Sequence, residues 1–170
     1  MSTVVENRIV KLGLSLGICL LAGYFNSLYA IPLIPSWFAS LKKPGFFLPD
    51  SLFVPAGLVV YLLLGLTLFF IWKSDTTEHN EKQVCVFLFI TSLILNVLWV
   101  YAFFWLQSPF LGLMIIIFLF AILMATLYQT LRVSFGATLL LLPYLIVTFL
   151  VAYMNYGIVK MNPQLPFFPI

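Results

Sequence analysis

Long uninterrupted runs of apolar residues dominate this sequence, and polar positions gather in short stretches between them. Five runs are long enough to cross a bilayer as a helix, which takes about 20 residues. They cover residues 9–31, 52–72, 83–106, 109–131 and 135–159. The runs are continuously apolar, whereas strands of a membrane β-barrel alternate over about ten residues. The pattern therefore predicts an all-α membrane protein, a bundle of five transmembrane helices in a single domain covering residues 1–170.

The connections between the runs indicate how the helices pack. Two of them, 107–108 and 132–134, are very short, so the last three helices are expected to be antiparallel neighbours. Residues 73–82 (KSDTTEHNEK) are aqueous in character, and the longest connection, residues 32–51, holds Trp37 and an adjacent pair of lysines. Almost nothing is left to lie outside the bilayer.

Composition supports a multi-pass integral membrane protein. Hydrophobic residues make up 64% of the chain and charged residues 8%, against about 45–50% and about 25% in soluble domains. The net charge of +3 is scattered, which excludes a nucleic-acid-binding surface. Basic residues number five on the N-terminal side and three on the other, which favours a cytoplasmic N-terminus and leaves the particular membrane open.

Groups that commonly carry catalysis or bind metals are nearly absent. Cys19 and Cys85 fall in or beside different spans and are expected to be buried free thiols, and His79 is the only histidine. No metal site is therefore expected. The spans also lack a buried carboxylate for a proton relay, and no nucleophile or acid–base constellation is visible.

Amide side chains interrupt the apolar spans at four positions, Asn26, Asn96, Gln129 and Asn155. A buried amide needs a partner, and in membrane bundles hydrogen bonds between helices supply it at about 1 kcal/mol each. The alternative is a ligand cavity between the helices. A separate GxxxG pair, at residues 13 and 17, permits close helix approach within or between subunits.

Four motifs follow one another along the predicted spans. They are WFASLKKP at residues 37–44, an Asn-x-x-Trp and Phe pair at 96–104, LLPYL at 141–145, and an Asn-Tyr with Lys and Asn at 155–162. In this order they resemble the TspO/MBR family, the translocator protein or tryptophan-rich sensory protein, also called the peripheral-type benzodiazepine receptor.

The resemblance implies a five-helix bundle, usually a homodimer, that binds porphyrins, sterols and benzodiazepine-like drugs. The ligand cavity lies between the helices under the first loop, and the protein acts as a receptor, carrier or stress regulator. No cofactor is implied beyond porphyrin or haem as a possible ligand. Carried over by motif, the pocket residues are Trp37, Lys43, Pro44, Asn96, Trp99 and Tyr144.

Each of these residues has a chemical role and a plainer alternative. Lys43 can meet a porphyrin propionate at the membrane surface, Trp37 and Trp99 can stack on a flat ring, and Asn96 can bond a carbonyl. The alternatives are an interfacial lysine, two tryptophans of the aromatic belt and a structural amide.

The chain also departs from the family pattern, with Phe46, Leu48, Gly57, Val147 and Val159 where the family has tryptophan or, for Leu48, proline. The tryptophans replaced by Gly57 and Val147 face the ligand in the family and are linked to porphyrin photo-oxidation. Glycine and valine can neither stack nor donate an electron, so the chain is expected not to be an enzyme. The cavity is expected to be wider at both positions.

Two further interpretations stay open. Val151, Tyr156 and Lys160 satisfy a proposed sterol pattern that many membrane helices match by accident. The alternatives to a ligand-binding protein are a small-solute membrane transporter and a porphyrin-degrading enzyme.

Overall fold

The computed structural model describes residues 2–45, 53–74 and 79–165. These residues form five α-helices, and two π-helical turns lie in the connections after the first and the third helix. The helices are α1 (Ser2–Ala30), α2 (Phe53–Lys73), α3 (His79–Val100), α4 (Pro109–Val133) and α5 (Phe135–Met161), with turns η1 (Ile34–Phe38) and η3 (Tyr101–Trp105). All five helices are long and apolar enough to cross a membrane, which confirms the predicted all-α membrane fold.

The helix ends differ from the apolar runs because a membrane helix can continue into water. The aqueous stretch was expected to reach residue 82, but α3 begins at His79, with the acidic Glu81 in its first turn, where a carboxylate favours the helix dipole. The connection expected over 32–51 contains the helical turn η1. Leu52, Phe46 and Leu48 lie outside the described residues.

Serine caps explain the sharp starts of α4 and α5. The hydroxyl oxygen of Ser108 accepts from the backbone N–H of Leu111 at 3.3 Å, and that of Ser134 accepts from Ala137 at 3.4 Å. Such caps satisfy backbone donors that have no helical partner. With Gln107 in the left-handed region at φ 50°, these short turns hold α3, α4 and α5 as antiparallel neighbours, as expected.

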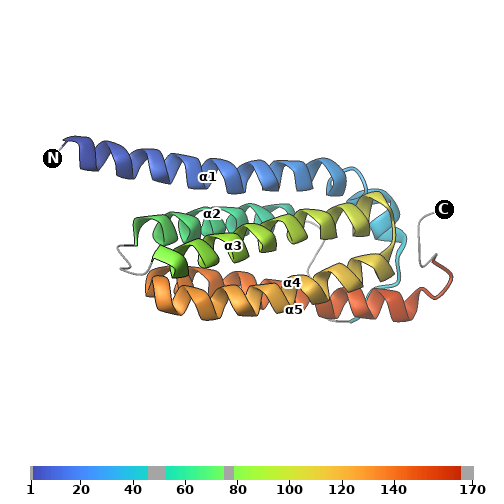
Figure 1. Cartoon of the computed structure of the whole chain (residues 1–170). Coiled ribbons are helices and arrows are strands. Elements are labelled where there is room, and N and C mark those ends of the chain that lie inside the picture. Colours follow the sequence, from blue (N-terminus) through green and yellow to red (C-terminus); the bar gives the residue numbers. More distant parts are fainter. Residues whose placement is uncertain (1, 46–52, 75–78, 166–170) are drawn as a thin grey trace.

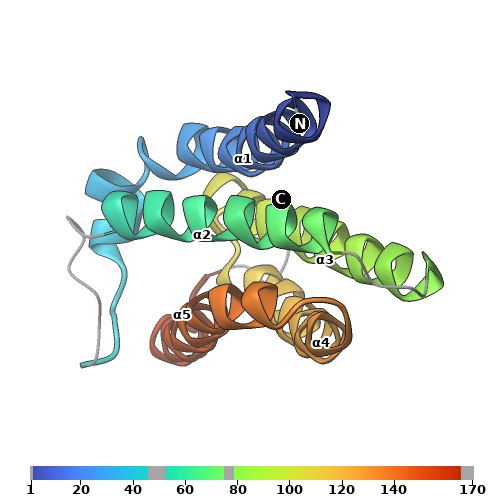
Figure 2. The ribbon, with the colours of Figure 1, turned by 90° about the vertical axis from the view of Figure 1, so that its left-hand side faces the viewer.

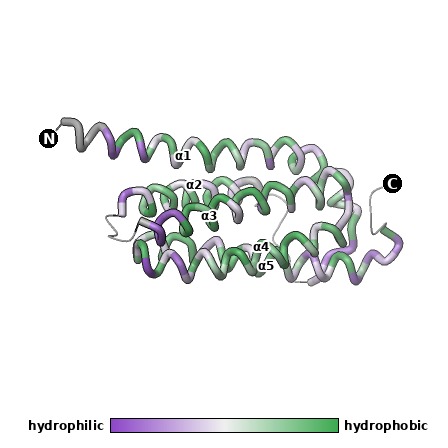
Figure 3. The backbone as a smooth tube through the Cα atoms, viewed as in Figure 1, coloured by the Kyte–Doolittle hydropathy of each residue, from purple (hydrophilic) through white to green (hydrophobic). Residues whose placement is uncertain are grey.

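The helices form three layers (Figures 1 and 2). The pair α2 and α3 lies in the middle, α1 covers one side and α4 and α5 cover the other. Helix α1 begins at one end of the bundle and α5 ends at the other (Figure 1), as an odd number of spans requires. Hydrophobic positions run along the helices and hydrophilic ones gather toward their ends (Figure 3).

Large apolar side chains cover the outside of the bundle as well as its core. Phe87 on α3 and Phe118 on α4 are 70% and 66% exposed, which suits lipid and not water. Inside, one group of buried side chains is mainly aliphatic, and a second has a larger share of aromatic rings, including Phe38, Trp99 and Phe103.

Basic side chains collect at the end of the bundle where α2 meets α3. The ammonium of Lys82 donates to the carbonyls of Trp72 at 2.9 Å and Ser74 at 2.7 Å, and Lys11 donates to Trp72 at 3.4 Å. Cations favour the carbonyl end of a helix. These contacts place Lys11 and Lys82 at one end of the bundle, as the span order predicted.

Two of the four span amides hold helices together, as the plainer interpretation expected. Asn155 on α5 donates to the carbonyl of Pro109 at 2.7 Å and accepts from the Trp99 indole at 3.1 Å. Gln129 on α4 donates to the carbonyl of Glu81 at 3.2 Å. The other two, Asn26 and Asn96, meet inside a cavity.

Candidate ligand-binding cavity

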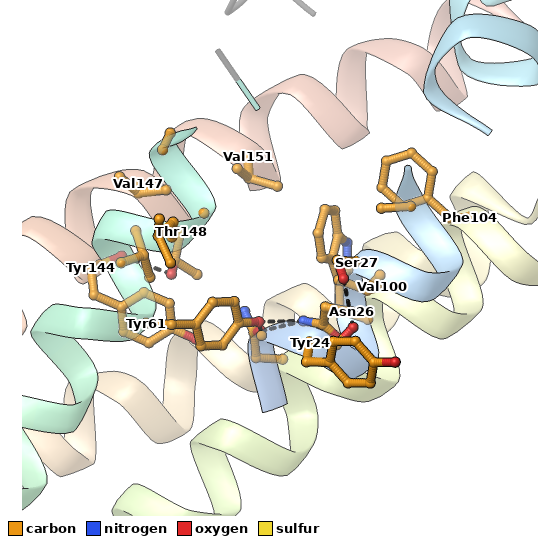
Figure 4. Close-up of a pocket in the computed structure, with 18 of the residues that line it drawn as sticks. Tyr24, Asn26, Ser27, Tyr61, Val100, Phe104, Tyr144, Val147, Thr148 and Val151 are labelled. Atoms are coloured by element: carbon orange, nitrogen blue, oxygen red, sulfur yellow. Dashed lines mark hydrogen bonds between the residues drawn. The ribbon is translucent and has the colours of Figure 1, made fainter. Parts of the chain in front are cut away.

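All five helices, together with η1 and η3, contribute to one cavity of about 430 Å³ (Figure 4). Ligand pockets in proteins measure about 300–1,000 Å³, so the space suits a small molecule. Most of its wall is aliphatic, from residues such as Leu20, Val60, Ile116, Leu119 and Val151. The wall therefore favours an apolar ligand.

The cavity reaches the lipid-facing surface of the bundle. Tyr24 and Leu58 line it and are also 58% and 56% exposed. They lie on α1 and α2, whose outer faces meet lipid. An apolar molecule dissolved in the bilayer therefore meets the cavity without crossing the aqueous phase.

Three polar side chains from three helices meet in the cavity wall, and we call them the polar triad: Asn26 on α1, Tyr61 on α2 and Asn96 on α3. The Tyr61 hydroxyl donates to Asn96 Oδ1 at 2.5 Å, and Asn26 Nδ2 donates to the same oxygen at 2.9 Å. Asn26 Nδ2 also donates to the Tyr61 hydroxyl (Figure 4). The triad links three helices by hydrogen bonds around one amide oxygen.

Two buried polar atoms of residues that line the cavity have no hydrogen-bond partner within the described part of the chain. They are Oδ1 of Asn26 and the hydroxyl of Tyr144 on α5, and the two residues are only 6% and 2% exposed. Thr148, one turn further along α5, donates its hydroxyl to the Tyr144 carbonyl at 2.8 Å. Burying an unpaired polar group costs about 1–3 kcal/mol, and both atoms are enclosed within the packed wall and do not lie on its surface.

The positions of the two replaced tryptophans lie in the cavity wall. Gly57 on α2 and Val147 on α5 are both lining residues. A Cβ atom built on Gly57 would meet nothing within 4 Å. The space that a larger side chain would fill therefore stands open at Gly57.

The structure divides the six pocket residues implied by the resemblance into two groups. Asn96, Trp99 and Tyr144 line the cavity. Trp37 lies behind the wall, with its ring 6.3 Å from that of the lining residue Phe104 and 5.6 Å from Phe103. Lys43 and Pro44 also lie apart from the lining: the Lys43 ammonium is 4.2 Å from the Phe38 ring centre, and Pro44 packs against Gly157 on α5.

Asn162, just beyond α5, ties down the first loop. Its Oδ1 accepts from the backbone N–H of Lys42 at 3.0 Å, and its Nδ2 donates to the Lys42 carbonyl at 2.9 Å. Pro44 follows directly and contacts α5. Two hydrogen bonds, one in each direction, therefore hold the loop segment with Lys43 and Pro44 to the end of α5.

We expect Asn162→Ala to release this segment, because both hydrogen bonds to Lys42 are lost. Two bonds of about 1 kcal/mol each predict at least about tenfold faster amide hydrogen exchange at residues 41–45, measured by mass spectrometry in detergent. Gln164→Ala, at an exposed neighbouring position, is the control and is expected to change nothing. Unchanged protection in Asn162→Ala would show that the clamp does not hold the loop.

The three residues of the sterol pattern do not share one surface. Val151 lines the cavity, whereas Tyr156 is 55% exposed and Lys160 is exposed on the outside of α5. A single ligand on the outer face of α5 can touch the last two but not the first.

Two residues of the triad, Asn26 and Tyr61, were not among the predicted pocket residues. The signal for Asn26 was its amide within an apolar span, which fits structural and ligand-binding roles equally. Tyr61 belongs to none of the four motifs, and a tyrosine within an apolar span is not a signal by itself. The role of a polar side chain within a span depends on which helices pack together, and the sequence of a single span does not show this.

Comparison with known proteins gives concordant matches along most of the chain. A model of the TspO/MBR family matches residues 15–161. The protein named Tryptophan-rich protein TspO from Chlorobaculum tepidum is 36% identical over 163 residues, covering 93% of this chain and 99% of that protein. Its namesake from Archaeoglobus fulgidus is 34% identical over 155 residues, covering 91% and 99%. Protein CrtK of Rhodobacter capsulatus is 27% identical over 129 residues, covering 75% and 79%.

Proposed function

Because this chain belongs to the TspO/MBR family, we propose that it binds a hydrophobic ligand in the cavity between its five helices. The ligand class is a tetrapyrrole, such as a porphyrin or haem precursor, or a lipid or sterol. Binding there makes the protein a receptor, carrier or stress regulator. The observation that carries the proposal is the apolar cavity, lined from all five helices, with the polar triad in its wall.

In this proposal the protein binds its ligand and does not transform it. Gly57 and Val147 line the cavity where the family's reactive tryptophans are expected, and neither side chain can be oxidised by a photoexcited ring. The remaining tryptophan in the wall, Trp99, donates its indole N–H to Asn155 and serves as part of the wall. A bound porphyrin is therefore expected to stay intact under light.

A second copy of the chain is the proposed protein partner, as the family resemblance implies. Gly13 and Gly17 on α1 have open space where a Cβ would stand, with no atom within 4 Å. The GxxxG pair is thus not used for packing inside the described chain. The face of α1 that carries it is available to a second copy.

The test of the proposed function is fluorescence titration of the detergent-purified protein with protoporphyrin IX, in darkness and then under light. We expect saturable quenching and a stable porphyrin absorption spectrum during illumination. Trp99→Ala is expected to weaken binding at least about tenfold, because an aromatic wall and its stacking energy are lost. Trp105→Ala is the matched control, since Trp105 is 58% exposed on the outside of the bundle.

Two results would count against the proposal. Equal loss of binding in Trp99→Ala and Trp105→Ala would place the porphyrin outside the cavity. Bleaching of the porphyrin by the unmodified protein would show that the chain carries out the photo-oxidation that its cavity wall argues against. A thermal melt of each variant separates weakened binding from loss of fold.

A further inference from the structure

One wall residue of the cavity, Trp99, is held by neighbours on two sides of its ring. The indole stacks on the Phe103 ring, with the ring centres 5.5 Å apart and the planes at 26°. Its N–H donates to Oδ1 of Asn155 on α5 at 3.1 Å. One face and the nitrogen edge are therefore occupied, and Trp99 is only 7% exposed in the cavity wall. The parts of the indole left to meet a ligand are the opposite face and the benzo edge.

The amide of Asn155 matches its two partners at both ends. Its Oδ1 accepts from Trp99, while its Nδ2 donates to the carbonyl of Pro109 on α4 at 2.7 Å. An indole N–H only donates and a carbonyl only accepts, so one orientation of the amide satisfies both. Asn155 is fully buried, and water does not replace a hydrogen bond that is lost in an apolar interior. The indole of Trp99 therefore has one favoured orientation.

A glycine on α4 allows close packing around this amide. A Cβ atom at Gly112 would lie 3.1 Å from Asn155 Oδ1 and 3.2 Å from the Cβ atom of Phe103. The two groups that hold the Trp99 ring thus pack against the same stretch of α4 backbone. Tight packing on the far side keeps Asn155 and Phe103 from following a rotation of the indole.

Resting on the proposed function, we infer that Asn155 is a positioning residue for ligand binding, because it sets the plane in which the Trp99 indole meets a flat ligand. Within the described chain, Asn155 lies outside the cavity lining, so it acts through Trp99 and does not touch the ligand. The energy of ring stacking depends on the relative orientation of the two rings. An indole that is free to rotate must also be ordered when the ligand binds, which lowers affinity.

The experiment is a double-mutant cycle on the binding of protoporphyrin IX to the detergent-purified full chain. Binding is followed in darkness by the fluorescence of the porphyrin, so the loss of a tryptophan does not alter the probe. Asn155→Leu removes the acceptor and keeps a side chain of similar size, and Trp99→Phe removes the donor and keeps a ring in the wall. We expect Asn155→Leu to weaken binding about fivefold when Trp99 is present, as the loss of one stacking contact predicts. In the Trp99→Phe background we expect a change of less than about twofold.

The second background separates positioning from a merely structural role. Asn155 also ties α5 to α4 through Pro109, and Asn155→Leu removes that bond whichever ring stands at position 99. A structural effect would therefore weaken binding equally in both backgrounds. Asn155→Ala is taken through the same cycle, with the same expected result, so that the outcome does not depend on how leucine packs at this position.

Gln129→Leu is the matched control for the loss of a buried amide. Gln129 on α4 is also buried and bonded to a backbone carbonyl, that of Glu81 at 3.2 Å, but it is not among the described residues of the cavity lining. This variant is expected to lower the melting temperature and to leave the affinity for protoporphyrin IX unchanged.

The outcomes separate this inference from the function on which it rests. Equal losses of affinity in the two backgrounds, or no loss in either, would overturn the positioning role and leave the ligand-binding function standing. If protoporphyrin IX did not bind the unmodified protein saturably, the proposed function would fall and the inference with it.

Discussion

Gly57→Trp is expected to turn a protein that binds protoporphyrin IX without altering it into one that bleaches the bound pigment under light. The position lies in the cavity wall, and a Cβ atom there meets nothing within 4 Å. An indole can therefore enter the cavity and stack on a flat ring. It restores the tryptophan that the family resemblance implies at this position, and with it the side chain that the resemblance connects to photo-oxidation. The measurement is loss of porphyrin absorbance during illumination in air, compared with darkness.

Gly57→Phe is the control for this change. It fills the same space with an aromatic ring that is a much poorer electron donor, so we expect binding without bleaching. Bleaching in both variants would assign the effect to the narrowed cavity and not to the indole. If Gly57→Trp bound the pigment and left it intact for as long as the unmodified protein does, the missing tryptophan would not explain the absence of chemistry.

Gly65→Val is expected to destabilise the fold, because α1 and α2 come into contact at this glycine. A Cβ atom at position 65 would lie 2.7 Å from Leu16 Cδ2 and 3.0 Å from Leu16 Cα. The second contact is with backbone, so a side-chain rotation cannot relieve it. Overpacking of this kind costs about 1–3 kcal/mol, to be measured as a fall in melting temperature and in the free energy of unfolding in detergent.

The matched control is Gly57→Val on the same helix, where a Cβ atom meets nothing within 4 Å, and both variants are melted without ligand. Both variants replace a glycine with valine inside a helix, so the change in helix propensity contributes equally to the stability of the two variants. Because the contact of α1 with α2 also positions Asn26 against Tyr61, Gly65→Val is expected to weaken ligand binding as well. Equal melting temperatures for the two variants would show that this contact is not tight in the membrane protein.

Most of the fold could be predicted because the bilayer imposes a simple rule on sequence. A span needs about 20 apolar residues with its backbone hydrogen bonds closed within the helix, and the five runs met that rule. The rule marks the part of a helix inside the membrane, not its ends. It therefore missed the start of α3 at His79, as well as the helical turn η1 inside the first loop.

The candidate site was predicted in part, and the division has a physical cause. Asn96, Trp99 and Tyr144 sit at motif positions in the middle of spans, and the structure brings them to the cavity. Asn26 and Tyr61 depend on the contact of α1 and α2 with α3. Apolar periodicity carries little information about such pairings when helices are apolar on all sides.

Loop residues were harder to assign because they pack on one another. An aromatic ring and a lysine near a membrane surface can meet a ligand or a neighbouring side chain. Here Trp37 packs on Phe103 and Phe104, and Lys43 packs on Phe38. Their roles in ligand binding remain predictions, which the exchange experiment on Asn162→Ala begins to address.

The most direct test of the central claim is a crystal structure of the protein grown with protoporphyrin IX. We predict ligand density between the helices, against Gly57, Trp99 and Tyr144. Density confined to the outer face of α5, beside Tyr156 and Lys160, with the cavity unfilled, would contradict the account.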